Sequence, residues 1–538
     1  MERVVNSVGD YAAVAGLAPQ SPSMSARWTR WLTPSLCDVF FAAILAWLFL
    51  AGSGGWTFLL LDGDCGWHIR TGEVILDTGA VPHTDPFSFT RPGEPWFAWE
   101  WLSDVLFAVL HRAMGLKGVV LLAGVLIALF ATVLLRQVLA AGAALFVALP
   151  LTLLAVGAST LHHLARPHLF TLLLLPVSLW ILQSDRRVPS RRVWLLIPLT
   201  AIWTNLHGGF LALVACVALL AAGSAVEGAL GVSGGWRHAR RYGLLGVLCA
   251  VASLVNPYGL ALHGHIAAYL RSSWIREVVQ EFQSPNFRSE SLFQFEGLMF
   301  LGVGVAATLL LRRRVVEALW ILFWAHLALG SVRHVPLFAA VAVPLVAAEL
   351  SRPWRRWTGN APKASAAGAL AGLEAERTPQ FLRTSVWPVL LVAVLAALSD
   401  PVKWPKDFPA AGFPAAAVRD FGPLLETSRV LTSDQWADYL IYHGCGRQRV
   451  YIDGRSDFYG EALGLEYMAV SAARWDWSRI LDRRAIDVVL APAGWPLASV
   501  LKMQPSWRVL RDDGQAVLFC RGSHCGSAPT QARSKGIP

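Results

Sequence analysis

The chain has 538 residues, of which 55% are hydrophobic and only 15% are charged. This composition is too apolar for a soluble globular protein and indicates a polytopic α-helical membrane protein. A net charge of +10 would suit a nucleic acid or an anionic surface as partner. Most of the excess lies in short loops, however, so orientation in a lipid bilayer explains it and no nucleic-acid partner is expected.

About eleven apolar runs approach the length of a membrane-spanning helix, which is about 17 to 25 residues. The first run is too long for a signal peptide and has no small-residue cleavage site after it. We therefore expect it to stay as a span behind a cytoplasmic tail at residues 1–35. The spans expected in a transmembrane domain at 36–399 are 39–61, 116–135, 139–158, 165–183, 193–206, 208–226, 242–256, 296–311, 315–331, 334–350 and 385–399.

The loops between these runs differ in charge. Basic residues dominate the loops 184–192, 227–241, 312–314 and 351–385, whereas 62–117 and 256–296 contain more acidic than basic residues. Because Lys and Arg mark cytoplasmic loops, the first four loops are predicted to be cytoplasmic and the other two outside. This predicts a cytoplasmic N-terminus and a C-terminus outside the membrane.

The segment 62–115, called the first loop below, opens on an Asp-x-Asp pair, Asp62 and Asp64, and is rich in tryptophan. A carboxylate at the end of a membrane helix is energetically unfavourable unless it contacts water, a cation or a basic side chain. Asp62 and Asp64 are therefore candidates for catalysis or for binding a metal. The alternative is that they only cap a short helix that begins near Trp67.

Polar residues recur at the outer ends of later spans. Arg166 and His168 begin the fourth span, and an arginine at this depth needs an anion unless it reaches out to lipid head groups. The other polar residues at outer ends are Asn205, His207, Asn256, Tyr258, Arg333 and His334. Polar groups gathered at one face of a helix bundle indicate a water-filled site there.

Residues 400–525 have the composition of a soluble domain, and 526–538 of a disordered tail. Strands are predicted at Val430–Thr432, Arg449–Ile452, Val488–Ala491, Trp507–Arg511 and Ala516–Cys520, and helices at Gln435–Tyr442, Glu461–Ala473 and Ala498–Met503. The alternation predicts a small α/β domain. Its polar residues at strand ends form either a binding site or a set of turns and salt bridges; they are Asp434, Asp438, Asp453, Arg455 and Asp457.

Three cysteines, Cys445, Cys520 and Cys525, belong to this outer domain. An oxidising compartment permits one disulfide among them, and the sequence leaves the pairing open.

Acids outside the first span and cations at other span ends suit transfer of a sugar from a lipid-linked phosphosugar. The donor phosphate would meet Arg166, His168, Arg333 or His334, and a carboxylate would activate the acceptor hydroxyl. The Asp pair could instead hold a divalent cation, such as Mg or Mn, that polarises the phosphate. The residues expected to line the substrate pocket are His68, Glu100, Asn205, His207, Asn256 and Tyr258.

Several segments carry a resemblance to a known family. They are DGDCGWHIRTG, TDPFSFTRPGEPWFAWEWL, ARPHLF, TNLHGGF, NPYG, RHVPLF and YIDGRSDFYG. With the long first loop, the many spans and the C-terminal α/β domain, the chain resembles the GT-C superfamily of membrane glycosyltransferases. The nearer likeness is to the bacterial branch with protein O-mannosyltransferases, aminoarabinose transferases and lipopolysaccharide-core galacturonosyltransferase-like enzymes.

The resemblance implies a bacterial inner-membrane enzyme with a periplasmic α/β domain. Its donor would be a polyprenyl-phosphate sugar, and its acceptor an envelope glycan, lipid or protein. It also implies that Asp62 or Asp64 acts as base or metal ligand. The second outer loop is short here, so a second acidic residue found in many members has no clear counterpart unless Glu100 or Glu277 replaces it.

Two other functions fit the same composition. A transporter or flippase would also have many spans and polar groups in the membrane, but carriers usually show internal repeats and charges at mid-membrane. This sequence shows no repeat and concentrates its charges at one face, which favours the enzyme. A non-catalytic partner in envelope polysaccharide assembly is the third hypothesis.

Overall fold

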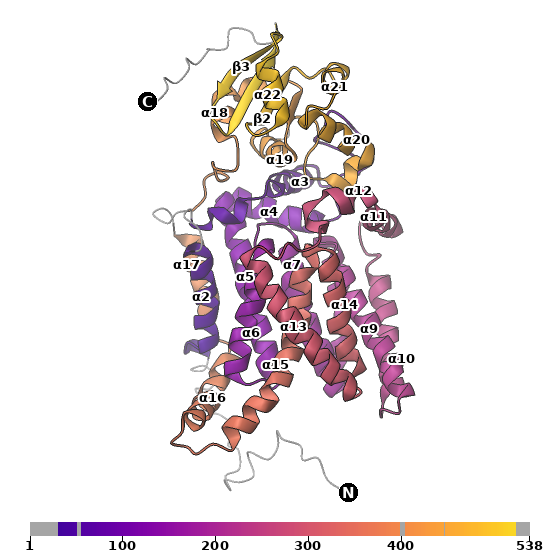
Figure 1. Ribbon diagram of the computed structural model, residues 1–538, viewed down its shortest axis with the longest axis vertical. Coiled ribbons are helices and arrows are strands. Elements are labelled where there is room, and N and C mark those ends of the chain that lie inside the picture. Colours follow the sequence, from indigo (N-terminus) through magenta and orange to yellow (C-terminus); the bar gives the residue numbers. More distant parts are fainter. Residues whose placement is uncertain (1–30, 51–54, 399–403, 446, 523–538) are drawn as a thin grey trace.

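The computed structural model describes residues 31–50, 55–398, 404–445 and 447–522. A bundle of long helices carries a small α/β domain at one end, called the domain end below (Figure 1). The predicted tail at 526–538 and most of the tail at 1–35 lie outside the described residues.

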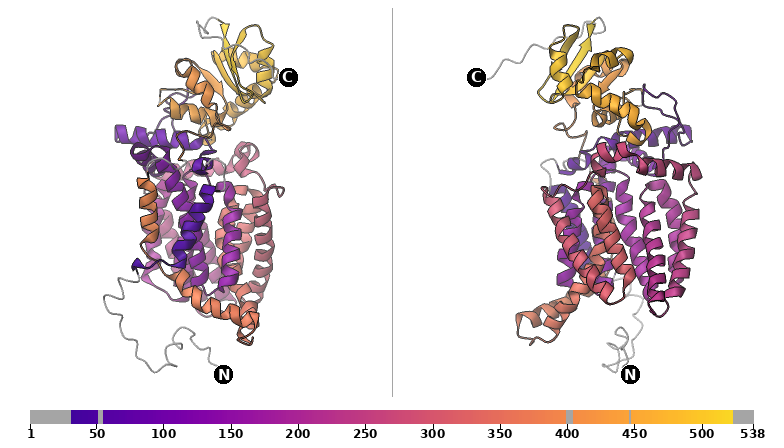
Figure 2. Two further views of the ribbon diagram at one scale, coloured as in Figure 1. Left: turned by 90° about the vertical axis from the view of Figure 1, so that its left-hand side faces the viewer. Right: turned by 45° about the vertical axis from the view of Figure 1, so that its right-hand side comes forward.

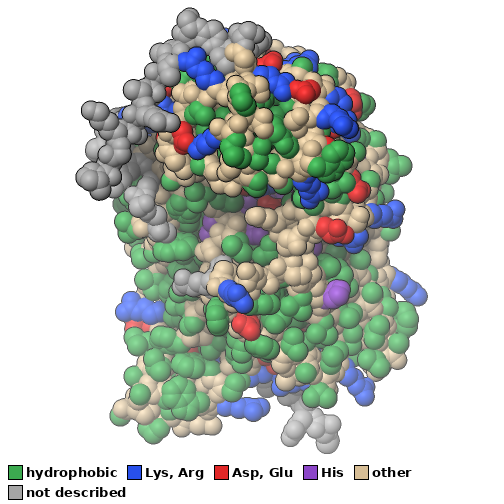
Figure 3. All heavy atoms as spheres, turned by 45° about the horizontal axis from the view of Figure 1, so that its top comes forward, with side chains coloured by type: hydrophobic (Ala, Val, Ile, Leu, Met, Phe, Trp, Pro, Cys, Tyr) green, Lys and Arg blue, Asp and Glu red, His purple; other side chains and the backbone are tan. Residues whose placement is uncertain are grey.

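The bundle is built from apolar helices that run between the domain end and the opposite end. Hydrophobic side chains cover much of its flank (Figure 3). Its helices are α2 (Leu36–Leu50), α5 (Leu116–Ala140), α6 (Leu145–Ala158), α7 (His168–Arg187), α8 (Leu196–Leu206), α9 (Phe210–Ala229), α10 (Gly235–Ala252), α13 (Glu290–Leu311), α14 (Val315–Gly330), α15 (Val335–Gly359) and α17 (Trp387–Ala397).

Each of the eleven predicted spans overlaps one of these helices. Among the described residues, five helices are long and apolar enough to cross a membrane. A sixth results if α16 (Ala366–Leu382) and α17, bent by 58°, form one span. The chain is therefore a multi-pass membrane protein, and the count of eleven stays a prediction.

A layer of shorter helices covers the domain end of the bundle (Figure 2). Helices α3 (Asp64–Thr78) and α4 (Trp101–Met114) come from the first loop, and α11 (Leu260–Arg271) and α12 (Ser273–Val278) from the loop after α10. Short 3-10 turns complete the connections at this end: η1 (Gly55–Leu60), η2 (Thr160–His162), η4 (Gln280–Phe282) and η5 (Val332–His334). A further turn, η3 (Arg191–Leu195), joins α7 to α8 at the opposite end. The first loop is thus a folded layer that joins bundle and domain.

The C-terminal domain has a four-stranded mixed sheet in the order β1-β2-β4-β3. Strand β1 pairs parallel with β2, while β4 pairs antiparallel with both β2 and β3. The strands are β1 (Val430–Thr432), β2 (Val488–Pro492), β3 (Trp507–Asp512) and β4 (Ala516–Arg521), and the helices are α18 (Ala415–Thr427), α19 (Asp434–His443), α20 (Ser456–Ser471), α21 (Trp477–Arg483) and α22 (Pro496–Lys502).

The strand predicted at Arg449–Ile452 is wrong. Only Val450 forms isolated bridges, one to Val430 and one to Ser88 of the first loop. Its backbone N–H and C=O bond to Phe87 and Phe89, both at 3.0 Å. The first loop takes the hydrogen bonds that a fifth strand would have used. Of the outer cysteines, Cys445 is free and Cys520 is disulfide-bonded, while Cys525 lies outside the described residues.

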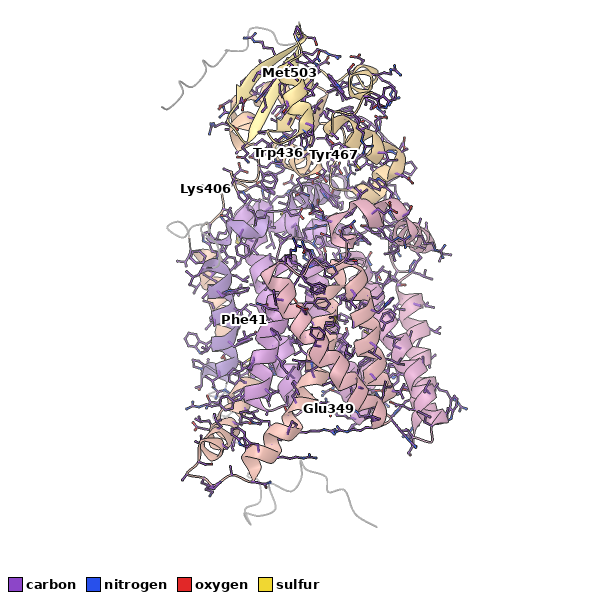
Figure 4. All side chains as sticks on the ribbon, in the orientation of Figure 1. Phe41, Glu349, Lys406, Trp436, Tyr467 and Met503 are labelled. Carbon is purple, nitrogen blue, oxygen red and sulfur yellow. The ribbon has the colours of Figure 1, made fainter. Side chains whose placement is uncertain are left out.

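At the opposite end of the bundle, buried glutamates pair with the arginines that the sequence assigned to cytoplasmic loops. Glu227 lies 2.6 Å from Arg186, and Glu349 contacts Arg312 and Arg314. Figure 4 shows Glu349 far from the C-terminal domain. The two ends of the bundle therefore carry separate charge clusters.

Glycines of α3 allow it to pack closely on both sides. A Cβ on Gly66 would lie 2.6 Å from the carbonyl oxygen of Asp438 in α19. A Cβ on Gly72 would overlap with the carbonyl oxygen of Asp104 in α4. Arg455 adds a buried ion pair across the same junction, 2.7 Å from Asp85 of the first loop. The α/β domain is thus fixed to the first loop by close packing and by charge.

We predict that Gly66→Ala and Gly72→Ala each destabilise the protein by about 1–3 kcal/mol, the usual cost of an overpacked contact. Gly264→Ala in α11 is the matched control, because its Cβ would meet no atom within 4 Å and alanine favours a helix more than glycine does. Thermal unfolding of the detergent-solubilised protein, followed by tryptophan fluorescence, measures the effect. Equal melting temperatures for all three variants would contradict this packing.

Candidate active site

A cavity of about 860 Å³ lies between the first loop, the domain ends of the bundle helices and the C-terminal domain. Nine of the twelve predicted site residues line it: Asp62, Asp64, His68, Glu100, Arg166, His168, His207, Arg333 and His334. Residues far apart in the sequence therefore meet in one place.

The other three predicted pocket residues, Asn205, Asn256 and Tyr258, are not among the lining residues. Asn205 accepts a hydrogen bond from Trp101 and donates to Val255 O, which ties α8 to α4 and to the turn after α10. Asn256 bonds to backbone groups of its own turn. The Tyr258 hydroxyl accepts from Ala98 N–H and donates to Pro82 O. Their polar atoms hold the surrounding structure together instead of facing the cavity.

Arg166, just before α7, is the centre of the charge arrangement. Its guanidinium lies 2.8 Å from Asp62, 2.7 Å from Asp64 and 2.6 Å from Glu281 of η4. Three carboxylates from two loops thus surround one cation. The interaction joins the start of α7 to the first loop and to the loop after α12.

Burial and neighbouring charges shift the pKa of these acids in opposite directions. Burial raises the pKa of Asp64 to about 7 although Arg166 opposes the shift. Burial also acts to raise the pKa of Glu281, but Arg166 and Arg333 together outweigh it and lower that pKa. At neutral pH, Glu281 is therefore ionised, whereas Asp64 is more easily protonated than an ordinary aspartate.

Asp64 also faces a second carboxyl group, that of Asp438 in α19. Asp64 Oδ1 and Asp438 Oδ2 have no hydrogen-bond partner among the described residues. Gly454 lies against both, and a Cβ there would overlap with Asp64 Oδ1. Burial is the main cause that raises the pKa of both groups, and repulsion from Asp64 adds to the rise at Asp438. This favours a protonated carboxyl in the pair.

The divalent cation implied by the resemblance would be held by Asp62 and Asp64. Carboxylate oxygens are suitable ligands for Mg or Mn. Here, however, each of the two carboxylates gives one oxygen to Arg166. Across the described residues, no group of three His, Cys, Asp or Glu side chains is arranged to hold a metal ion. The arrangement does not fit the cation.

Arg333, in η5, is less completely neutralised than Arg166. Its guanidinium lies 3.6 Å from Glu281 and 3.4 Å from the Tyr269 hydroxyl, and it stacks over Phe282. The histidines beside it differ: His168 Nε2 bonds to His162 O and His334 Nδ1 to Leu327 O, whereas both ring nitrogens of His162 lack a partner among the described residues. Among these cavity residues, Arg333 and His162 therefore have the most hydrogen-bonding groups left free to bind an anion.

A second group of titratable residues forms another wall of the cavity. His68 Nδ1 lies 2.6 Å from the buried Asp104. Its Nε2 lies 3.6 Å from Glu100, and His207 Nε2 lies 3.4 Å from the other oxygen of Glu100. Burial raises the pKa of Glu100 to about 8. Glu100 is thus an acid near its midpoint at neutral pH, and it lines the cavity.

The cavity continues into an apolar part between the membrane helices. Leu172 of α7, Leu211 and Ala215 of α9, Phe323 of α14 and Leu337 of α15 line it. One space therefore joins an ionic end near the α/β domain to an apolar end within the bundle.

Several lining residues were not predicted. They are Glu281, Tyr269, Trp274, Trp96 and Trp99. Asp453, Arg455 and Asp457 of the C-terminal domain, whose role the sequence left open, also line the cavity. His265 of α11 lies 2.9 Å from Asp457, which links the loop after α10 to this domain. The acidic bias of loop 256–296 and the motif YIDGRSDFYG were the available signals. The sequence left open whether that motif binds a ligand, and its acids both line the cavity and form salt bridges.

No family model and no curated protein matches the sequence. Among solved structures, the chain is similar to the archaeal oligosaccharyltransferase AglB from Archaeoglobus fulgidus in complex with an inhibitory peptide and a dolichol-phosphate. The TM-score is 0.51 at 13% identity, covering 91% of this chain and 74% of that one. The chain therefore has the GT-C fold.

The same GT-C fold appears in the Archaeoglobus fulgidus oligosaccharyltransferase tethered to an acceptor peptide containing the NVT sequon. That comparison gives a TM-score of 0.51 at 12% identity over 90% of this chain and 74% of the other. At this identity the likeness concerns the fold alone. It is the fold that the resemblance of the sequence motifs implies.

We predict that Arg166→Met destabilises the protein by about 3–5 kcal/mol, because it leaves buried carboxylates without their cation. Arg166 holds the pKa of Glu281 low, so this stability is present above the unfolded-state pKa of glutamate, about 4.3, and is lost as pH falls below it. The deficit of the variant is therefore expected to be full at neutral pH and to shrink below about pH 4.

Arg288→Met, at an exposed position of the same loop as Glu281, is the control. Chemical unfolding at several pH values measures the difference. A deficit independent of pH would contradict the role of Arg166 as the neutralising cation.

Proposed function

We propose that the protein is a membrane glycosyltransferase that moves a sugar from a polyprenyl-phosphate donor to a hydroxyl-bearing acceptor. The observation that carries the proposal is the continuity of the cavity. Its apolar part is lined by side chains of membrane helices and suits an isoprenoid chain, while Arg333, Arg166 and several histidines lie at its ionic end. A lipid-linked phosphosugar has the same two-part chemistry.

In this proposal the donor phosphate binds at Arg333, beside His162 and His168. Arg166 is already neutralised by three carboxylates, so Arg333 supplies the charge that a phosphate requires. As the bond between sugar and phosphate breaks, negative charge grows on the leaving phosphate. A fixed guanidinium stabilises that charge without further reorganisation.

Asp62 and Asp64 stay in the proposed catalytic centre as the carboxylates that position Arg166. Asp62 uses one oxygen for Arg166 and the other for the backbone N–H of Asp64, at 2.9 Å. The aromatic side chains of Trp96, Trp99 and Tyr269 line the same cavity. They offer flat apolar surfaces against which a sugar ring can pack.

The finer assignments come from the resemblance and the loop charges. We place the protein in the bacterial branch of the superfamily and in the inner membrane, with an envelope glycan, lipid or protein as acceptor. The α/β domain would be periplasmic, because the arginine-rich loops lie at the opposite end of the bundle. A reporter fused after Pro538 should be active only outside the cytoplasm, and cytoplasmic activity would overturn the orientation.

Sugar transfer provides the direct test of function. Purified protein would be incubated with a panel of radiolabelled polyprenyl-phosphate hexoses and with envelope fractions as acceptors. Arg333→Ala is expected to lower the transfer rate by about 10²–10³-fold, as for loss of one preorganised charge at a developing anion. Asp62→Asn is also expected to reduce transfer, because Arg166 loses one of its carboxylates.

Arg288→Ala is the matched control for Arg333→Ala, since both replace an arginine but only Arg333 lines the cavity. Size-exclusion profiles of all variants would confirm that folding is kept. Equal transfer by the wild-type protein and Arg333→Ala would contradict the donor site. A wild-type protein without transfer on any donor would contradict the function.

A further inference from the structure

Glu100 differs from the other carboxylates at the cavity. The carboxylates of Asp62 and Asp64 both bind Arg166, and the free oxygen of Asp64 is buried against Asp438. The side chain of Glu100 lines the cavity and is 12% exposed. Among the described residues its oxygens take part in no hydrogen bond, and it does not cap α4 although it occupies the N-cap position. Glu100 is therefore available to a substrate.

Two imidazoles flank this carboxylate. His68 Nε2 lies 3.6 Å from Oε2 and His207 Nε2 lies 3.4 Å from Oε1. These distances are slightly longer than hydrogen bonds. Contacts of this kind often tighten only when substrate is bound.

The protons on these imidazoles can be assigned from their other nitrogens. Gly209 N–H donates to His207 Nδ1 at 3.0 Å, and the Thr171 hydroxyl lies 2.7 Å from the same nitrogen. His207 Nδ1 is therefore an acceptor, and in the neutral ring Nε2 carries the hydrogen. That hydrogen points toward Glu100.

His68 is held in a similar way by Asp104. The two groups lie 2.6 Å apart, with Asp104 fully buried and Trp67 stacked on the imidazole at 3.6 Å between ring centroids. Burial lowers the pKa of His68 and raises that of Asp104. Burial thus favours an overall neutral pair, in which one proton lies between Oδ1 and Nδ1 and Nε2 also carries a hydrogen. His68 cannot turn without breaking this buried contact.

We propose that Glu100 is the general base of the transfer reaction, and that His68, held by Asp104, is the positioning residue that orients it. This rests on the proposed glycosyl transfer and assigns the proton acceptor within it. The Asp-x-Asp pair then organises Arg166, and proton transfer belongs to a separate wall of the same cavity.

The acceptor hydroxyl oxygen forms a bond to the anomeric carbon of the sugar while the bond from that carbon to the phosphate oxygen breaks. The electron pair of the broken bond leaves with the polyprenyl phosphate. The hydroxyl proton passes to Glu100, and after product release it returns to water in the cavity.

The electrostatic surroundings of Glu100 suit a base at neutral pH. The charged and titratable groups that face it are His68, Asp104 and Asp64 from the first loop, His207, Arg166 and Arg333 from the bundle, and Asp457 from the C-terminal domain. Burial raises the pKa of Glu100 most, whereas Arg166 and Arg333 oppose the rise and keep it at about 8. Since the base must be ionised, the transfer rate is expected to rise with pH up to about 8.

The first arm of the test measures transfer with the donor panel as a function of pH. Glu100→Gln is expected to lower the rate by about 10²–10⁴-fold, the range for a general base. Glu94→Gln, on an exposed side chain of the same first loop but outside the cavity, is the control and should not change it.

Two substitutions of similar size at Asp104 separate orientation from packing. Asp104→Asn still donates to His68 Nδ1, so it should keep most of the activity and the wild-type pH profile. Asp104→Leu leaves that nitrogen without a hydrogen-bond partner. It should therefore lower the transfer rate and shift the midpoint of the pH profile of transfer. Equal effects of both variants, without a change in midpoint, would overturn the positioning role.

The second arm does not depend on turnover. Dicyclohexylcarbodiimide reacts with protonated carboxyl groups in apolar sites, and the adducts are mapped by mass spectrometry. At about pH 6 Glu100 should be protonated and modified, and labelling should decline as pH rises through about 8. Asp104→Leu should move this decline as well.

The two arms distinguish the possible failures. A wild-type protein that transfers no sugar overturns the proposed function. It also overturns the role of Glu100 as base in that reaction, even if the carbodiimide labelling is as expected. Transfer that persists in Glu100→Gln overturns the base assignment alone. Absence of an adduct on Glu100 at about pH 6 contradicts the titration on which the pH profile depends.

Discussion

The ion cluster at Arg166 is the interaction on which the rest of the site depends. One guanidinium holds three carboxylates from the first loop and from the loop after α12. In an apolar bundle, such charges are tolerated only when they neutralise one another. The cluster therefore holds two loops in place beside the cavity. Among the described arginines that line the cavity, Arg333 has the fewest carboxylates close enough to neutralise its charge.

The second constraint is the close packing of α3 between α4 and α19. Glycines at 66 and 72 allow backbone contact on both sides, which brings the C-terminal domain over the first loop. Asp453, Arg455 and Asp457 can then line the same cavity as residues from the bundle. The domain is thus one wall of the site, and the cavity combines a rigid ionic end with an apolar end between helices.

The sequence predicted the apolar helices of the bundle and all four strands of the sheet, and nine of its twelve predicted site residues line the cavity. Hydrophobic runs and strand ends are local properties, so they can be read from the chain. Asn205, Asn256 and Tyr258 fell outside the cavity because their exact direction depends on tertiary contacts. Arg449–Ile452 did not form a strand because the first loop took its hydrogen bonds. The partners of Arg166 were also hidden, since Glu281 is distant in sequence and only the fold brings it near.

We propose that this cavity binds a polyprenyl phosphate with its tail between the bundle helices and its phosphate at Arg333. The decisive experiment is a structure determined with a bound polyprenyl monophosphate. We expect phosphate oxygens within hydrogen-bond distance of the Arg333 guanidinium and isoprene units against Leu211, Phe323 and Leu337. A lipid found only on the outer surface of the bundle, with the cavity unchanged, would contradict it.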